Sequence, residues 1–222
     1  MRMQFGVLTI LLAVLAVSVL LGLTHNQIRE YFYPKSALMS EREFWKVIDD
    51  ARKHGTSDDK LRKGLVTELG KLSNDDVRRF AKRFNERMAH AYDMKLWSAV
   101  YTLNQGCGDD SFMDFRDYLI MMGEKDYTQI VNDPDSLVDC KLTPEGIHYS
   151  EMAFSQTIFE LGRPEIDKMQ YDIPAIREFY KHNLGAPLKN KGFNGDDEKV
   201  LQKELPRIWK YTQSRKAAVG DN

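Results

Sequence analysis

Hydrophobic residues recur every three or four positions over residues 40–91, the spacing of one face of an α-helix. The first segment starts at Ser40, a residue type that caps helix N-termini, and Glu43 follows three positions later, as in a capping box. Further helices are predicted to start at Ser57 and Ser73. The apolar positions are Phe44, Val47, Ile48 and Ala51, then Leu61, Leu65, Leu69 and Leu72, then Val77, Phe80, Phe84, Met88 and Ala91. The pattern therefore predicts three consecutive helices.

Helical spacing continues along the rest of the chain, with glycines and prolines at the breaks. The predicted helices cover residues 93–103, 109–122, 124–131, 149–161, 174–180 and 198–209, the last interrupted at Pro206. No segment of strand length alternates apolar and polar residues with β-branched side chains. We therefore predict an all-α fold, a multi-helix globular domain over residues 39–216, followed by a disordered tail at residues 217–222.

Residues 5–23 form an uncharged apolar stretch preceded by a four-residue tail, residues 1–4. As a helix this stretch spans about 28 Å, close to the thickness of a bilayer's hydrocarbon core. It is longer than the apolar part of a cleavable signal, and no small-x-small cleavage site follows. We interpret it as a single transmembrane anchor in the lipid bilayer, joined to the domain by a linker at residues 24–38. A cleaved signal peptide is the alternative.

The charges beside this stretch do not decide its orientation. Arg2 lies on one side, whereas Arg29, Lys35 and Arg42 lie within about 20 residues on the other, the range that the positive-inside rule counts. A short tail is easily left inside or translocated. We expect a single-pass membrane protein, and the outside placement of the domain is slightly favoured.

Charge and motif content argue against several functions. The chain has 32 Lys and Arg against 33 Asp and Glu, a net charge of −1, which argues against a dedicated nucleic-acid binder. Its two cysteines, Cys107 and Cys140, are few for a disulfide scaffold, although they can pair in an oxidising compartment. A P-loop, a G-x-S-x-G elbow, an H-E-x-x-H motif, a C-x-x-C pair and a dinucleotide fingerprint are all missing. We therefore predict no cofactor.

The strongest candidate site is the turn at residues Gly106-Cys107-Gly108. It brings the thiol of Cys107 and the carboxylates of Asp109 and Asp110 to a helix start, with Asp114, Arg116 and Asp117 in the next turn. Adjacent acids bind cations or exchange a proton, and an arginine holds an anionic group or a partner's carboxylate. The alternative is that Asp109 and Asp110 only cap the helix and that Arg116 pairs internally.

Two weaker patterns resemble metal sites. Glu145, His148 and Glu151 have the i, i+3, i+6 spacing of carboxylate-bridged metal helices, but no second Glu-x-x-His exists. Asp133-x-Asp135 with Asp139 is faintly similar to a calcium loop, but the glycine of the turn and the closing glutamate are missing. We predict no metal site, and interpret the second pattern as a turn and helix cap.

Two further groups have a structural and a functional interpretation. The third helix carries a basic cluster, which could meet anionic lipid heads but more simply forms a solvated helix face. The cluster consists of Arg78, Arg79, Lys82, Arg83 and Arg87. The three tryptophans, Trp45, Trp97 and Trp209, are either an aromatic recognition surface or, at helical spacing beside apolar residues, part of the core.

Several of these segments together resemble the bacterial domain-of-unknown-function family 4240, over roughly residues 39–210. The matching segments are Met39 to Asp49, Ala91-Tyr92, Leu96-Trp97, Gly106 to Ile120, Asp133 to Leu137 and Leu205 to Trp209. Gly108 departs from the family, which usually has Ser there, and Tyr118 stands where Trp is frequent. A membrane anchor is also unusual for it. The family name implies no reaction.

We therefore expect a non-enzymatic binding module, tethered to a bacterial inner membrane, that offers the acidic turn and Arg116 to a protein partner. An immunity-like or envelope-regulatory role fits such a module. The alternative is an enzyme of unassigned class, in which Asp109 or Asp110 is a base or a metal ligand and Arg116 holds an anionic substrate.

Overall fold

The computed structural model describes residues 38–140, 142–143, 146–147, 154–162 and 188–220. The chain divides into two compact units, Met1–Leu38 and Met39–Asn222, and all described helices belong to the second. The predicted anchor at residues 5–23, nearly all of the linker and the helix predicted from Pro174 lie outside the described residues. Within the described ranges, no helix combines the length and the apolar character that crossing a membrane requires.

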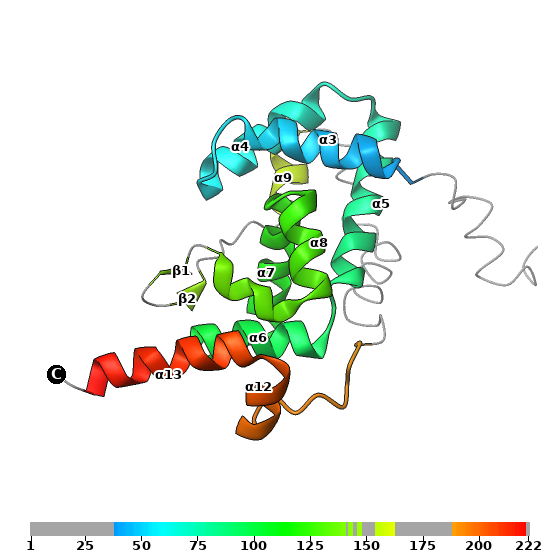
Figure 1. The fold of residues 1–222 in the computed structure, drawn as a ribbon. Coiled ribbons are helices and arrows are strands. Elements are labelled where there is room, and N and C mark those ends of the chain that lie inside the picture. The colour runs from blue at the N-terminus through cyan, green and yellow to red at the C-terminus, as the bar shows by residue number, and fades with distance from the viewer. Residues whose placement is uncertain (1–37, 141, 144–145, 148–153, 163–187, 221–222) are drawn as a thin grey trace, which may run out of the picture. The chain divides into compact units, whose positions relative to one another are not determined.

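The second unit begins with the three helices that the hydrophobic pattern predicts (Figure 1). They are α3 (Glu41–Arg52), α4 (Asp58–Gly70) and α5 (Asn74–His90). Ser40 and Glu43 form the predicted capping box, in which each side chain accepts from the backbone N–H of the other residue. Ser73 caps α5 by accepting from Asp76 N–H at 3.2 Å. Ser57 is at the N-cap of α4, but its side chain makes no capping bond.

Helices α3 and α4 approach each other closely at Gly64, in the middle of α4. A Cβ at this position would lie 2.3 Å from the carbonyl oxygen of Ala51, so only glycine fits there. Glycine inside a helix costs about 1 kcal/mol relative to alanine. The close packing of two helix backbones explains why this cost is tolerated.

Three further helices follow, namely α6 (Met94–Asn104), α7 (Asp109–Met121) and α8 (Glu124–Asn132). Asp93 caps α6 by accepting from Lys95 N–H at 2.8 Å and from Leu96 N–H at 3.3 Å. Gly123 separates α7 from α8 with a φ of +95°, a conformation that side chains other than glycine rarely adopt. The predicted breaks before and after α7 are therefore confirmed.

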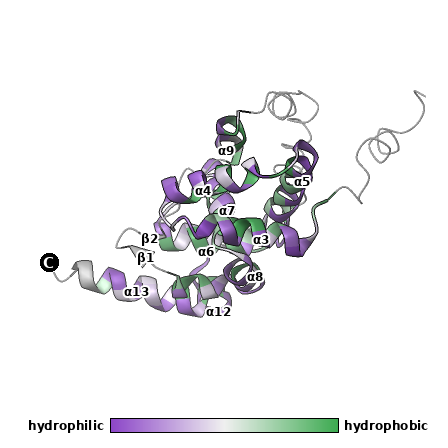
Figure 2. Cartoon of the chain, turned by 90° about the horizontal axis from the view of Figure 1, so that it is seen from above, coloured by the Kyte–Doolittle hydropathy of each residue, from purple (hydrophilic) through white to green (hydrophobic). Residues whose placement is uncertain are grey.

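The core lies between these helices and includes apolar side chains from all six of them. Figure 2 shows that α3 and α5 carry both hydrophobic and hydrophilic stretches, as the amphipathic pattern predicts. Aromatic rings join distant segments, since Phe84 of α5 stacks on Phe154 with 4.3 Å between the ring centroids. Trp45 is buried, and Trp97 and Trp209 are partly buried against the same core. The core interpretation of the tryptophans is therefore confirmed.

Short elements follow α8. They are the 3₁₀-helix η2 (Pro134–Asp139), the two-residue strands β1 (Leu142–Thr143) and β2 (Gly146–Ile147), and α9 (Phe154–Glu160). The strands pair antiparallel, with Leu142 opposite Ile147 and Thr143 opposite Gly146. The described helices confirm the predicted all-α fold. The two-residue hairpin is a small addition to it.

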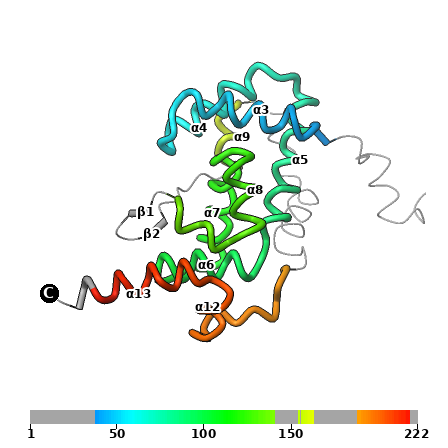
Figure 3. The backbone as a smooth tube through the Cα atoms, in the orientation of Figure 1, coloured from blue at the N-terminus to red at the C-terminus, as the bar shows by residue number. Residues whose placement is uncertain are grey.

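The chain ends in α12 (Glu198–Glu204) and α13 (Pro206–Gly220), which Figure 3 shows beneath α6 and η2. Pro206 is the first residue of α13, where its missing N–H costs nothing, so the predicted interruption is confirmed. Helix α13 continues beyond Lys216, however, and the predicted disordered tail is helical over residues 217–220. Alanines, which are strong helix formers, extend this helix until Gly220.

Candidate functional site

The predicted site lies in the turn that joins α6 to α7. Gln105 ends α6 in the left-handed conformation, with a φ of 58°, and Gly106 follows with a φ of +153°. Gly108 is the N-cap of α7, and its carbonyl accepts from Phe112 N–H at 2.9 Å. Two successive residues with positive φ reverse the chain within a few residues. This reversal places the acidic pair at the start of α7.

The side chain of Trp97, on α6, holds the turn in place. Its indole Nε1–H donates to the carbonyl oxygen of Cys107 at 2.9 Å. The same ring stacks on Phe112 of α7, with 4.9 Å between the centroids and 9° between the planes. One side chain of α6 thus holds both the backbone of the turn and the first turn of α7. The turn therefore lies at the edge of the core, and its backbone conformation is already fixed.

Asp109 and Asp110 are exposed on this turn. No hydrogen bond or ion pair of either carboxylate occurs with the residues that the structure describes. The expectation that they cap α7 through side-chain bonds is therefore not met, although their charge lies at the favourable end of the helix dipole. Gly106 and Gly108 beside them face open space, because a Cβ built on either would meet no atom within 4 Å. Both carboxylates are thus accessible to a partner.

Arg116 is not exposed beside these acids, as a partner-binding arginine has to be; only 1% of it is accessible. Its Nη1 donates to the carbonyl of Met88 at 2.9 Å and its Nε to that of Phe112 at 3.3 Å. The guanidinium also lies 4.8 Å from the ring centroid of Tyr92. Burial lowers the pKa of Arg116 to about 10, so it is charged at neutral pH. Arg116 therefore joins α5 to α7 inside the domain.

The other two residues of the predicted site, Cys107 and Asp114, are also shielded from solvent, Cys107 more than Asp114. Cys107 is buried, with its sulfur 3.7 Å from the carbonyl of Gly108, which fits a structural thiol. It is a free cysteine, as is Cys140. Asp114 is partly buried on α7. Of the five predicted site residues, only Asp109 and Asp110 are therefore exposed together.

Asp117 was noted beside the predicted site but was not predicted to bind a partner, and the structure buries its carboxyl. It accepts from the backbone N–H of Phe154 at 3.1 Å and so joins α7 to α9. Burial raises the pKa of Asp117 to about 7, against the opposing effects of this hydrogen bond and of nearby Arg116. Apolar residues on several sides of α7 were the available signal, because a helix buried all round also buries its polar positions.

One aspartate of the faint calcium pattern, Asp135, caps a helix, as the interpretation of the pattern as a turn and helix cap predicts. Asp135 is buried, and its carboxylate accepts from the backbone N–H groups of Arg207 and Ile208 at the start of α13. Asp139 forms an ion pair with the Arg207 side chain. No group of three His, Cys, Asp or Glu side chains suited to a metal occurs in the described part of the chain. Glu145, His148 and Glu151 lie outside it.

The basic cluster of α5 is largely neutralised by acids of the domain. Arg79 pairs with Asp76 at 3.2 Å, and Arg83 and Arg87 share Glu41 at 3.2 and 2.9 Å. Both of these arginines also pair with another acid of α5, Glu86. These contacts support the interpretation of the basic cluster as a solvated helix face rather than as a lipid-binding surface.

The comparisons with known proteins identify a family without a described activity. The family model described as "Protein of unknown function (DUF4240)" matches residues 39–160, which is more than half of the chain. The match includes α3 to α9 and therefore the whole acidic turn. No curated protein and no solved structure matches the chain.

Proposed function

We propose the function of the chain from its own residues, because it belongs to the family described as Protein of unknown function (DUF4240), and that description names no activity. The protein is a non-enzymatic binding module that presents Asp109 and Asp110 to a basic surface of a protein partner. One observation carries the proposal: both carboxylates are exposed, with no hydrogen bond to the described residues, on a turn whose backbone Trp97 holds.

This geometry supports binding for two reasons. A turn that is already fixed loses little conformational entropy when a partner binds it. Two neighbouring exposed carboxylates attract arginine or lysine side chains, and such charges mainly increase the association rate and select the partner. The open space around Gly106 and Gly108 also lets a partner's backbone approach closely.

An enzyme that uses this turn is the weaker candidate. Such an enzyme would need an arginine that holds an anionic substrate. Arg116 does not suit this role, because it is buried and donates to two backbone carbonyls. Catalytic acids and bases usually lie in an enclosed cleft, whereas Asp109 and Asp110 are exposed.

We further propose that residues 5–23 hold the domain at a bacterial inner membrane. The support for this part is the sequence itself, an uncharged apolar stretch of bilayer-spanning length. A tethered domain meets partners that are anchored in or delivered to the same membrane, which suits an immunity-like or envelope-regulatory role.

The test is affinity capture of the full-length protein from its native membranes. The Asp109→Asn/Asp110→Asn variant removes the two charges and keeps the side-chain shapes. The matched control is Glu124→Gln/Asp196→Asn, which removes two exposed carboxylates elsewhere, one of them also in the first turn of a helix. A partner recovered in equal amount with the wild type and the control, but depleted with the Asp109/Asp110 variant, supports the proposal.

Titration with the purified partner then measures how much the two carboxylates contribute to the affinity. We expect the dissociation constant of the Asp109→Asn/Asp110→Asn variant to increase about 2- to 30-fold at low salt, the range for two exposed ion pairs. The difference between variant and wild type should shrink as salt screens the charges. Equal affinity of the wild type and this variant would show that the partner binds a different surface.

A further inference from the structure

A second candidate site lies at the opposite end of α6 from the acidic turn. A cavity of about 510 Å³ is bordered by the start of α6, the end of α8, the segment at residues 188–197 and the end of α12. Figure 3 shows α12 below α6 and α8 above it. Cavities of a few hundred Å³ bind small molecules in many proteins. The size therefore suits a compact ligand rather than a folded partner.

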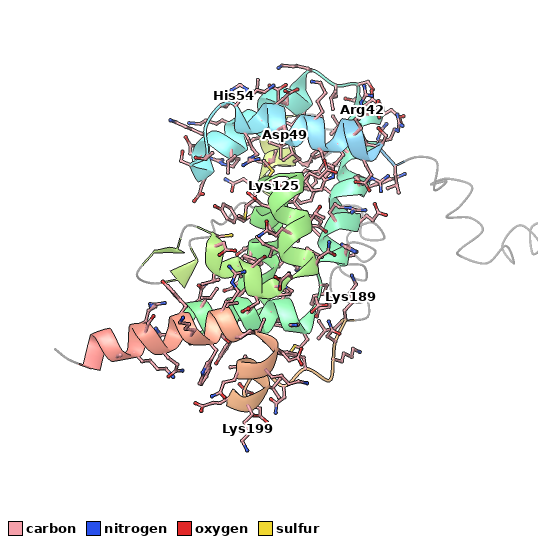
Figure 4. The ribbon with its side chains drawn as sticks, viewed as in Figure 1. Arg42, Asp49, His54, Lys125, Lys189 and Lys199 are labelled. Carbon is pink, nitrogen blue, oxygen red and sulfur yellow. The ribbon has the colours of Figure 1, made fainter. Side chains whose placement is uncertain are left out.

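One wall of the cavity is fixed by backbone hydrogen bonds. Met94 N–H donates to the carbonyl of Lys189 at 2.9 Å, and Lys189 N–H donates to that of Tyr92 at 3.2 Å. The Lys189 side chain, labelled in Figure 4, donates to the carbonyl of His90 at 2.7 Å. The segment at residues 188–197 is thus joined to the start of α6 like a short strand, which keeps the cavity's shape.

Asp93 and Asn190 close the polar corner of the cavity. The amide Nδ2 of Asn190 donates to Asp93 Oδ2 at 2.7 Å, and Asp93 Oδ1 accepts from the first amides of α6. Both oxygens of Asp93 are therefore already used within the protein. Asn190 keeps a left-handed conformation, with a φ of 53°, which places its side chain in this contact.

Lys95 and Glu204 are the charged groups at the cavity whose contact with each other a ligand could replace. Lys95 Nζ lies 3.4 Å from Glu204 Oε2, which is longer than the 2.7–2.9 Å of a good charged hydrogen bond. Both side chains are partly exposed on the cavity, and Glu204 also contacts Lys203 at 3.1 Å. One positive and one negative group thus stand side by side at the cavity with a weak contact between them.

The rest of the lining is mixed. Val131, Pro134 and Phe193 supply apolar surface, and Asn132 supplies an amide. Counting charges, the lining holds two carboxylates, Asp93 and Glu204, against one ammonium, that of Lys95. A phosphate or another polyanion is therefore disfavoured by charge. A ligand with one charge of each sign and a small apolar body satisfies every group.

We propose that this cavity binds a small zwitterion of the amino-acid type. Its carboxylate replaces Glu204 on the Lys95 ammonium, its ammonium binds the Glu204 carboxylate, and its apolar side chain lies against Phe193 and Val131. This site is independent of the acidic turn, so either proposal can hold without the other.

The first experiment needs no variant. Isothermal titration of the full-length protein in detergent uses L-leucine and L-phenylalanine as probes, compared with N-acetyl-leucine and leucinamide, each of which lacks one of the two charges. We expect the zwitterions to bind and each blocked analogue to bind at least about 10-fold more weakly, because one charged contact is lost. Absence of binding by both amino acids up to about 10 mM, a concentration well above weak millimolar affinity, overturns the proposal.

Variants then locate the site. Gly192 lines the cavity, and a Cβ there would meet no atom within 4 Å, so Gly192→Trp adds a bulky side chain at the cavity without a clash at its Cβ. This variant and Lys95→Met should each weaken binding at least about 10-fold, as measured by the same titration. The control is Lys199→Met, a lysine in the first turn of α12 that does not line the cavity and points down, away from α6, in Figure 4. Unchanged affinity of Gly192→Trp places the ligand elsewhere and overturns the proposal.

Discussion

The carboxylate of Asp135 accepts the backbone N–H of Ile208 at 3.0 Å, although the two residues are 73 positions apart. The same carboxylate accepts from Arg207 N–H, so a residue of η2 caps the start of α13. The N-cap of a helix is usually the residue just before it, and here Leu205 holds that place without a side-chain oxygen to accept from the first amides. The Asp133-Pro134-Asp135 and Leu205-Pro206-Arg207 segments are therefore parts of one contact.

Removing this cap should destabilise the domain. We expect Asp135→Ala to lower the free energy of unfolding by about 2 kcal/mol, since helix caps contribute up to that amount and the amides are left without their acceptor. Urea unfolding monitored by circular dichroism measures the change. Asp139→Ala, which removes only an exposed ion pair with Arg207, is the control and should have a much smaller effect. Equal losses would mean that the charge, not the cap, stabilises α13.

Features set by neighbours in the sequence were predicted well, and features set by distant contacts were not. The capping box of Ser40 and Glu43 is local, and so is the interruption at Pro206. The cap by Asp135 was expected, but the helix that it caps was not, because a 73-residue separation leaves no periodic signal. The burial of Arg116 and Asp117 depends on which helices cover α7, and this is decided by tertiary packing.

The same distinction holds for the candidate sites. The acidic turn was predicted from glycines and aspartates that are adjacent in the sequence, and the structure exposes two of its five predicted residues. The Trp97 indole that fixes the turn lies ten positions before its acceptor, on a helix whose pattern indicated only core packing. The cavity joins residues near 95, 131, 192 and 204, and no spacing in the sequence predicts that they meet.

Arg116 should act on stability and not on partner binding. Arg116→Met removes its bonds to Met88 and Phe112 and its contact with the Tyr92 ring, and we expect a loss of about 2–3 kcal/mol in the free energy of unfolding. Arg116→Lys should also be destabilised, because an ammonium cannot reproduce the planar stacking of a guanidinium. Denaturant unfolding gives both values. Capture of the partner below the transition temperature should be unchanged; its loss in a folded Arg116→Met protein would assign Arg116 to the binding surface.

The stability of the domain should depend on the protonation of Asp117. Its pKa is raised by burial from 3.8 to about 7, so between these values the folded state keeps a proton that the unfolded chain has released. The stabilisation from the protonated carboxyl is full below pH about 4 and is lost as the pH rises to about 7, by at most about 1.4 kcal/mol per pH unit. Above that pH the contribution is constant.

Asp117→Asn tests this dependence, because asparagine keeps an oxygen for Phe154 N–H and never ionises. We expect the variant to gain stability relative to the wild type as the pH rises from 4 to 7, with no further gain above 7. Urea unfolding of both proteins at half-unit pH intervals measures the difference. A constant difference across this range would mean that Asp117 titrates alike in the folded and unfolded chains.

The loop beside the cavity offers a comparison between two glycines. Gly195 approaches α6 so closely that a Cβ would lie 2.4 Å from Ser98 Oγ and 2.8 Å from Ser98 Cβ, whereas at Gly192 it would meet nothing within 4 Å. We expect Gly195→Ala to destabilise the domain by about 1–3 kcal/mol, the usual effect of overpacking, because Ser98 is buried on a helix and cannot move aside. Gly192→Ala should be nearly neutral. Thermal unfolding of both variants gives the comparison, and amino-acid titration of Gly195→Ala reports whether a displaced loop also disturbs the cavity. Equal stability of the two variants would show that the close approach at Ser98 does not hold the loop in place.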